Sequence, residues 1–128
     1  VAGGLTVALL SAGEARAQGR LNRYAVVGVV NDTDTTLRYY FRWGQGSEWQ
    51  LCSVVPGKVR LHYWTYDFIN QNRSPVPQIK FDHDMTEDTL WKTYDLDACA
   101  CPTVDQRYAK NYAIRYKNRI YLKLVETN

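Results

Sequence analysis

Apolar and polar side chains alternate along residues 37–43, where every odd position is large and apolar and two even positions are arginines. Because successive side chains of a strand point to opposite faces, this alternation predicts a half-buried strand with a basic outer face. A glycine-containing turn at 44–47 and a Pro-Gly turn at 56–58 follow. Residues 36–64 are therefore expected to form three consecutive strands.

The same pattern of short aromatic strands and polar turns continues on both sides of this segment. Residues 24–30 are an almost continuous β-branched apolar run, which is typical of a strand in the middle of a sheet. Residues 67–77 carry two prolines and are expected to be a loop. Further strands are predicted at 78–82, 90–96, 108–116 and 120–126, and the last two form a hairpin. Residues 83–89 and 97–106 are interpreted as loops.

About eight short strands without helical periodicity predict an all-β fold. We expect residues 18–128 to form a single domain, an antiparallel β-sandwich of about eight strands. The loops differ widely in length, which favours two sheets with crossing connections. A small closed β-barrel is the alternative architecture.

The first seventeen residues differ in character from the rest. Val1–Leu10 is a short apolar segment, and Ala15-Arg16-Ala17 supplies the small-x-small pattern of a signal peptidase site. We interpret residues 1–17 as the remnant of a signal peptide, which predicts a secreted or periplasmic protein. The alternative is an apolar N-terminal helix or strand of the domain itself. The apolar segment is too short to span a bilayer.

Charge and composition narrow the function classes. Sixteen basic and thirteen acidic residues give a net charge of +3, and the basic residues are scattered rather than clustered. A nucleic-acid-binding protein would present a concentrated basic patch, so no nucleic-acid partner is predicted. Ten tyrosines and four tryptophans in 128 residues agree with the all-β interpretation.

Three cysteines offer two kinds of chemistry. In an exported protein thiols oxidise, so Cys52 is expected to form a disulfide with Cys99 or Cys101. Such a bridge would close a loop of roughly fifty residues and contribute about 4 kcal/mol. The alternatives are three reduced structural thiols, or a Cys-x-Cys redox or metal site.

An acidic loop offers hard oxygen ligands. Asp82, Asp84, Glu87 and Asp88 lie within seven residues of one another, a density that suits calcium. Their spacing lacks the glycine and terminal glutamate of the EF-hand. The alternative is a solvated acidic turn in which Asp84 or Thr86 caps the following residues. Apart from this weak indication of calcium, no cofactor is predicted.

Aromatic residues near strand ends are the strongest candidates for a binding site. Flat rings beside charged groups suit sugars or peptide segments, because rings supply rigid apolar surface and their neighbours supply hydrogen bonds. The alternative is that these rings fill the core, and that a histidine among them packs against tyrosines. No nucleophile elbow, phosphate loop or dinucleotide fingerprint is present, so no catalytic residue is predicted. The candidate binding residues are Tyr40, His62, Trp64, Tyr66 and Trp91.

Several short segments carry a resemblance to a known kind of domain. In order, they are N-D-T, Y-Y-F-R-W-G, E-W, V-P-G, H-Y-W-T-Y-D, R-S-P, F-D-H-D and K-T-Y-D-L. Over residues 31–96, with the final hairpin, the chain resembles small exported bacterial domains of unknown function that lie beside caspase-like peptidases in planctomycete-type proteins. These motifs are aromatic and structural, so the resemblance implies an accessory domain that binds rather than catalyses.

The functional expectation is an exported, non-enzymatic β-sandwich that binds a protein or a cell-envelope component. A carbohydrate-recognition module, with or without the help of calcium, is the alternative. A small hydrolase or redox protein built on His62 or on Cys99 and Cys101 is the third interpretation.

Overall fold

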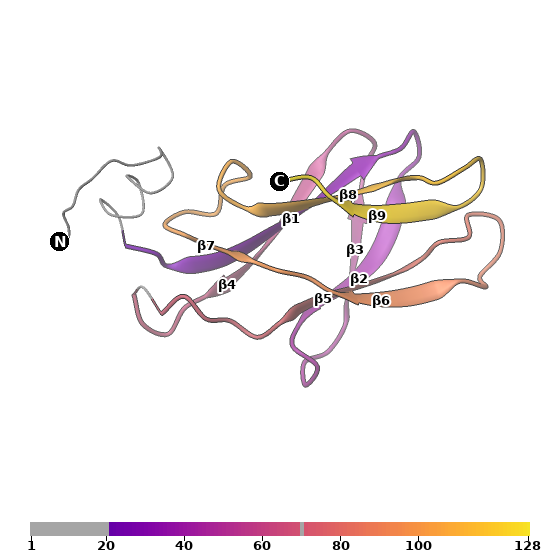
Figure 1. The fold of residues 1–128 in the computed structure, drawn as a ribbon. Helices are drawn as coiled ribbons and strands as arrows, with labels where there is room; N and C mark the ends of the chain where they lie inside the picture. Colours follow the sequence, from indigo (N-terminus) through magenta and orange to yellow (C-terminus); the bar gives the residue numbers. More distant parts are fainter. Residues whose placement is uncertain (1–20, 70) are drawn as a thin grey trace.

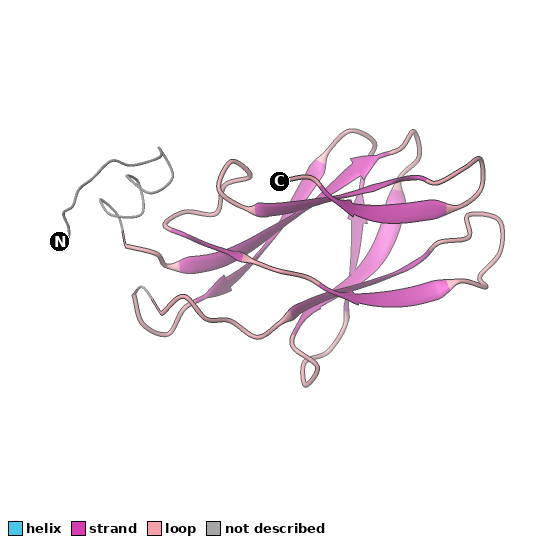
Figure 2. Ribbon diagram, in the orientation of Figure 1, coloured by secondary structure: helices cyan, strands magenta, loops and turns pink. Residues whose placement is uncertain are grey.

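The computed structural model describes residues 21–69 and 71–128, which contain nine strands and no helix (Figure 2). The predicted signal peptide, residues 1–17, lies outside the described residues. In the described part of the chain, no helix has the length and apolarity that crossing a membrane requires. The strands are β1 (Tyr24–Asp32), β2 (Leu37–Trp43), β3 (Gln50–Val54), β4 (Val59–Thr65), β5 (Pro77–Asp82), β6 (Trp91–Asp95), β7 (Cys99–Cys101), β8 (Lys110–Tyr116) and β9 (Leu122–Glu126).

The strands form two packed sheets, so the predicted β-sandwich is confirmed and the closed barrel is not formed. One sheet has the order β4-β1-β8-β9, with β7 also paired to β1, and the other has the order β3-β2-β5-β6. In Figure 1, β8 and β9 lie above β5 and β6. The Pro56-Gly57 turn carries the chain from one sheet to the other, and its glycine has a φ of 75°, which favours glycine.

Strand β1 is the centre of its sheet, as its apolar run predicts. It pairs over Tyr24–Val30 with antiparallel β4, and its second edge is divided between two partners. Strand β8 covers Val27–Asp32 of that edge and runs parallel to β1, unlike all other described pairings. Strand β7 covers Tyr24–Val26, which explains why three residues of a predicted loop become a strand: they satisfy backbone groups that β8 does not reach.

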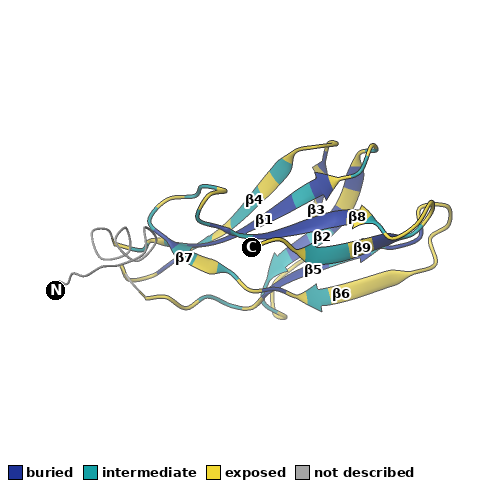
Figure 3. Cartoon of the chain, turned by 45° about the horizontal axis from the view of Figure 1, so that its top comes forward, coloured by how far each residue is buried: buried dark blue, intermediate teal, exposed yellow. Residues whose placement is uncertain are grey.

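The main core lies between the sheets and follows the predicted alternation. Leu37, Tyr39 and Phe41 point inward from β2 and are at most 7% exposed. They pack in one cluster with Ile79 and Phe81 of β5 and with inward residues of β1 and β8. Figure 3 shows the consequence: β1 and β8 are mostly buried, whereas β6 at the sheet edge is exposed over most of its length.

A second, smaller cluster covers the outer face of the β1 sheet. Val26, Cys101 and Ala109 are buried there beneath the segment that connects β7 to β8. Gly28 lies beside this cluster, and a methyl group added to it would overlap the carboxamide oxygen of Asn111. The close approach of β1 and β8 at this point therefore requires glycine.

The two clusters explain why the predicted disulfide is wrong. Cys52 belongs to the main core and lies opposite Tyr39 in the β2–β3 pairing, whereas Cys101 belongs to the second cluster. Cys99 is exposed on β7. The β1 sheet separates the main core from the second cluster, so Cys52 does not meet either cysteine of β7, and all three thiols are free.

Candidate functional site

The outer face of the β3-β2-β5-β6 sheet carries aromatic rings and cations side by side. Alternation turns Tyr40 and Arg42 of β2 away from the core, and the same alternation does so for Lys80 of β5. Tyr40 and Lys80 are direct partners in the β2–β5 pairing. Trp91, the first residue of β6, reaches the same face, where its ring lies 5.9 Å from that of Tyr40.

Cations and rings interleave on this face. The Lys80 ammonium lies 5.2 Å from the centre of the Tyr40 ring and 4.6 Å from that of Trp49. The Arg42 guanidinium lies 4.1 Å from the centre of the Trp49 ring. These distances are within the range of cation–π attraction, so each contact orients both a ring and a charge. Arg38 is exposed and points to the same side of β2 as Tyr40 and Arg42. We call these six residues the aromatic–basic face: Arg38, Tyr40, Arg42, Trp49, Lys80 and Trp91.

The cations of this face have no carboxylate partner among the described residues. The salt bridges in that part of the chain lie elsewhere, at Arg107–Asp105, Lys110–Glu126 and Arg115–Asp32. Arg42 donates instead to the Gln78 side chain at 2.8 Å, and Gln78 in turn donates to Asp95 at 2.6 Å. The face therefore presents cations that an external anion can pair with.

The face is also open and partly apolar. Trp91 is 43% exposed and Leu51, on the neighbouring edge strand β3, is 57% exposed. Two acidic residues, Asp82 and Asp95, reach the same face. Asp82 accepts hydrogen bonds from the backbone of Asp84 and Leu90, and Asp95 accepts one from Gln78. Both carboxylates are thus engaged within the domain.

Of the five predicted binding residues, the structure brings only Tyr40 and Trp91 together. His62 lies between the sheets, where its ring stacks 3.8 Å from that of Phe41 and its Nε2 shares a 2.7 Å hydrogen bond with the Tyr39 hydroxyl. Burial, with a smaller effect from the Arg60 charge, lowers the pKa of His62 to about 4. Trp64 packs against Trp43, which adjoins the main core. His62 is therefore a core residue, whereas Trp64 is half-buried and lies beside the core rather than in it.

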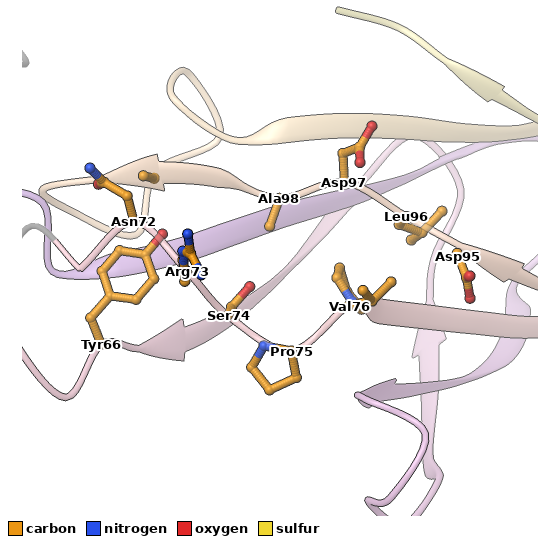
Figure 4. Close-up of a pocket in the computed structure, with 12 residues that line it drawn as sticks. Tyr66, Asn72, Arg73, Ser74, Pro75, Val76, Asp95, Leu96, Asp97 and Ala98 are labelled. Carbon is orange, nitrogen blue, oxygen red and sulfur yellow. The ribbon is translucent and has the colours of Figure 1, made fainter.

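Tyr66 belongs to a different place, a pocket of about 440 Å³ between the loop before β5 and the segment that joins β6 to β7. Figure 4 shows Tyr66 and Arg73 on one side and Asp97 and Ala98 on the other. Burial raises the pKa of Tyr66, with a further effect from the nearby cysteines of β7. The pocket is lined by both a cation and carboxylates, so its charge does not define one class of ligand.

The acidic loop is held together by its own carboxylates. Asp84 accepts hydrogen bonds from the Thr86 hydroxyl and backbone and from the Thr89 hydroxyl, and these hold its pKa at about 2. Asp88 accepts a hydrogen bond from the Trp91 indole. No three histidine, cysteine or acidic side chains within residues 21–69 and 71–128 form a group that could hold a metal ion. The hydrogen bonds of Asp84 match the capped acidic turn rather than a ligand set.

Sequence reasoning missed Trp49, Arg42, Arg38 and Lys80 as members of the site. The alternation along β2 already indicated a basic outer face, and the same alternation in β5 turns Lys80 outward. What the sequence lacked was the pairing of β2 with β5, which places Tyr40 against Lys80.

Comparison with known proteins found no relative of this chain. No protein-family model matches the chain, and no curated protein and no solved structure is significantly similar to it. The resemblance to exported domains beside caspase-like peptidases stays a prediction.

Proposed function

We propose that this domain is an exported, non-enzymatic binding module whose aromatic–basic face takes an acidic glycan of the cell envelope. The observation that supports the proposal is the interleaving of Lys80 and Arg42 with the rings of Tyr40 and Trp49 on one open sheet face, which also carries Arg38 and Trp91. None of these cations has a salt-bridge partner among the described residues.

The chemistry of the face suits this ligand class in two ways. Guanidinium and ammonium groups pair with carboxylate or sulfate groups, and arginine does so with two parallel hydrogen bonds. The exposed Trp91 ring beside Tyr40 offers flat apolar surface for the apolar face of a sugar ring. An acidic glycan is both an envelope component and a sugar, so it unites the two functional expectations.

The sheet also supplies a suitable spacing. Arg42 of β2 and Lys80 of β5 stand on paired strands, and neighbouring strands of a sheet lie roughly 4.8 Å apart. Cation–π contacts with Trp49 hold both charges in place before any ligand arrives. An extended anionic chain lying across the strands can therefore contact successive cations without ordering them first.

The test is calorimetric titration of the full chain with three polymers: polygalacturonate, which is acidic and made of sugars, neutral dextran, and polyglutamate, which is acidic without sugars. We expect binding to polygalacturonate that weakens with added salt, no binding to dextran, and about tenfold weaker binding to polyglutamate. Equal affinity for the two acidic polymers would overturn the glycan assignment, and no binding to polygalacturonate would overturn the proposed function.

Matched variants locate the binding surface. Lys80→Ala and Trp91→Ala are each expected to weaken polygalacturonate binding by about tenfold, since each removes one charge pair or one stacking surface. Lys123→Ala is the control, because Lys123 is an exposed cation on β9 of the other sheet. A loss in the control equal to that in Lys80→Ala would show that net charge, not this face, binds the polymer.

A further inference from the structure

Two cysteines at the edge of the β1 sheet are not used by the proposed binding face. Cys99 and Cys101 are the ends of the three-residue strand β7, so their side chains lie on the same face of that strand. Cys99 is exposed and Cys101 is 1% exposed. An accessible thiol thus stands next to a buried one, with Ala100 between them.

The two neighbouring thiols change each other's pKa. The Cys101 thiol has acceptors in the Cys99 carbonyl, at 3.2 Å, and the Tyr108 carbonyl, at 3.0 Å. The adjacent Cys101 side chain, together with the charge of Lys110, lowers the pKa of Cys99 below its usual range. The adjacent Cys99 side chain and burial raise the pKa of Cys101. Cys99 is therefore the nucleophile and Cys101 the protonated neighbour.

We propose that Cys99 and Cys101 form a thiol–disulfide switch that low-molecular-weight disulfides oxidise. In the first step the Cys99 thiolate attacks one sulfur of the small disulfide, which gives a mixed disulfide and releases one thiolate. In the second step the Cys101 sulfur loses its proton and attacks the Cys99 sulfur, which closes the Cys99–Cys101 bond and releases the second small thiol. The protein is oxidised by two electrons, and the small disulfide is reduced to two thiols.

The order of the two steps follows from the effect of the Cys99 charge on the deprotonation of Cys101. While Cys99 is a thiolate, its negative charge beside Cys101 and the burial of Cys101 keep the proton on Cys101. Capping of Cys99 as a mixed disulfide removes that charge, so the second thiol becomes easier to deprotonate after the first step is complete. The resolving thiol is already adjacent to the mixed disulfide that it attacks.

Closing this bond has a consequence for the fold. Residues two apart in an extended strand have Cα atoms roughly 6.6 Å apart, near the upper limit for a disulfide. The two Cβ atoms point the same way and are about equally far apart, whereas a disulfide needs them within about 4.5 Å, so closure requires β7 to bend. The pairing of β7 with Tyr24–Val26 of β1 is the contact that opposes the bend. Oxidation is therefore expected to loosen β7 from β1 and to move Cys101 out of the second cluster.

The chain offers a clean test by peptide mass spectrometry. The segment between Lys92 and Arg107 holds Cys99 and Cys101 but neither Cys52 nor a further trypsin site, so one tryptic peptide reports on the pair. The reduced full chain is treated with oxidised glutathione, unfolded, alkylated and digested. We expect this peptide to be unalkylated and lighter by two hydrogens, while Cys52 is alkylated. Alkylation of all three cysteines, or a bridge to Cys52, would overturn the switch.

Two variants separate the steps. Cys101→Ser is expected to stop at a glutathione adduct on Cys99, and Cys99→Ser is expected to leave Cys101 unmodified. Because Cys99 is exposed, its replacement leaves the buried cluster intact, so this variant tests only whether Cys99 is the thiol that attacks the small disulfide. At pH 7 Cys99 should react with iodoacetamide about tenfold faster than Cys101. Glutathione on Cys101 of Cys99→Ser, formed as fast as the wild-type adduct, would contradict the assigned roles.

Discussion

The buried position of His62 predicts that acid destabilises the domain. Burial lowers the pKa of His62 to about 4 from its usual value of 6.5. In the unfolded chain the imidazole regains its usual pKa, so between these two values the unfolded state binds more protons than the folded state. Stability from this group is fully present above pH 6.5 and is lost as the pH falls towards 4.

The size of the effect follows from the two pKa values. At pH 4.5 the unfolded histidine is almost fully protonated and the folded one is mostly neutral, which costs about 2.5 kcal/mol of unfolding free energy relative to pH 7.5. The pKa of His83 is also lowered by burial and acts in the same direction. A comparison of variants is therefore needed to isolate His62.

Urea unfolding of wild type and His62→Phe at several pH values between 7.5 and 4.5 measures the effect. Phenylalanine keeps the stacking on Phe41 but leaves the Tyr39 hydroxyl without its partner, a cost of about 1–3 kcal/mol that does not depend on pH in this range. The double variant Tyr39→Phe/His62→Phe removes both partners and avoids that cost. We expect the wild type to lose about 2.5 kcal/mol more than either variant. Equal losses would refute the assignment of a buried, neutral His62.

Two further predictions concern positions that join the strands. Gly28→Ala is expected to lower the unfolding free energy by about 1–3 kcal/mol, because the added methyl group would displace Asn111. Gly46 has open space around it, so Gly46→Ala should change the unfolding free energy by less than about 0.5 kcal/mol. Equal effects of the two variants in thermal unfolding would contradict the close approach of β1 and β8. Asn31 is fully buried, and its side chain donates hydrogen bonds to the carbonyls of Thr35 and Val54. Asn31→Ala should therefore lower the unfolding free energy, measured with urea, by about 2–4 kcal/mol, clearly more than Thr33→Ala. A loss no larger than that of Thr33→Ala would mean that water replaces these hydrogen bonds.

The sequence predicted the parts of the fold that depend on local alternation. The two-residue period of β2 predicts that the Tyr39 side chain points into the core and that the Arg38 side chain points outward, as observed. The apolar run of β1 correctly indicated a central strand. Local pattern does not report pairing partners, so the parallel contact of β1 with β8 and the addition of β7 to the Tyr24–Val26 edge were not predictable.

The candidate site was predictable only in part, for the same reason. The sequence predicts Tyr40 and Trp91 as binding residues because they are aromatic residues near strand ends, and their rings do meet. His62 was placed with them because it lies in an aromatic segment, yet it points from β4 into the core. Trp49 joins the face from just before β3, and only the register of β2 with β3 brings it beside Arg42.

The most direct test of the binding face uses the four tryptophans as built-in reporters. Trp49 and Trp91 belong to the aromatic–basic face, whereas Trp43 and Trp64 pack against each other away from it. Each indole N–H gives a separate signal in a ¹H–¹⁵N NMR spectrum of the labelled full chain. On addition of polygalacturonate fragments, the signals of Trp49 and Trp91 should shift with a common affinity while those of Trp43 and Trp64 stay in place. Shifts confined to Trp43 and Trp64, or no shift in any of the four, would contradict the proposed face.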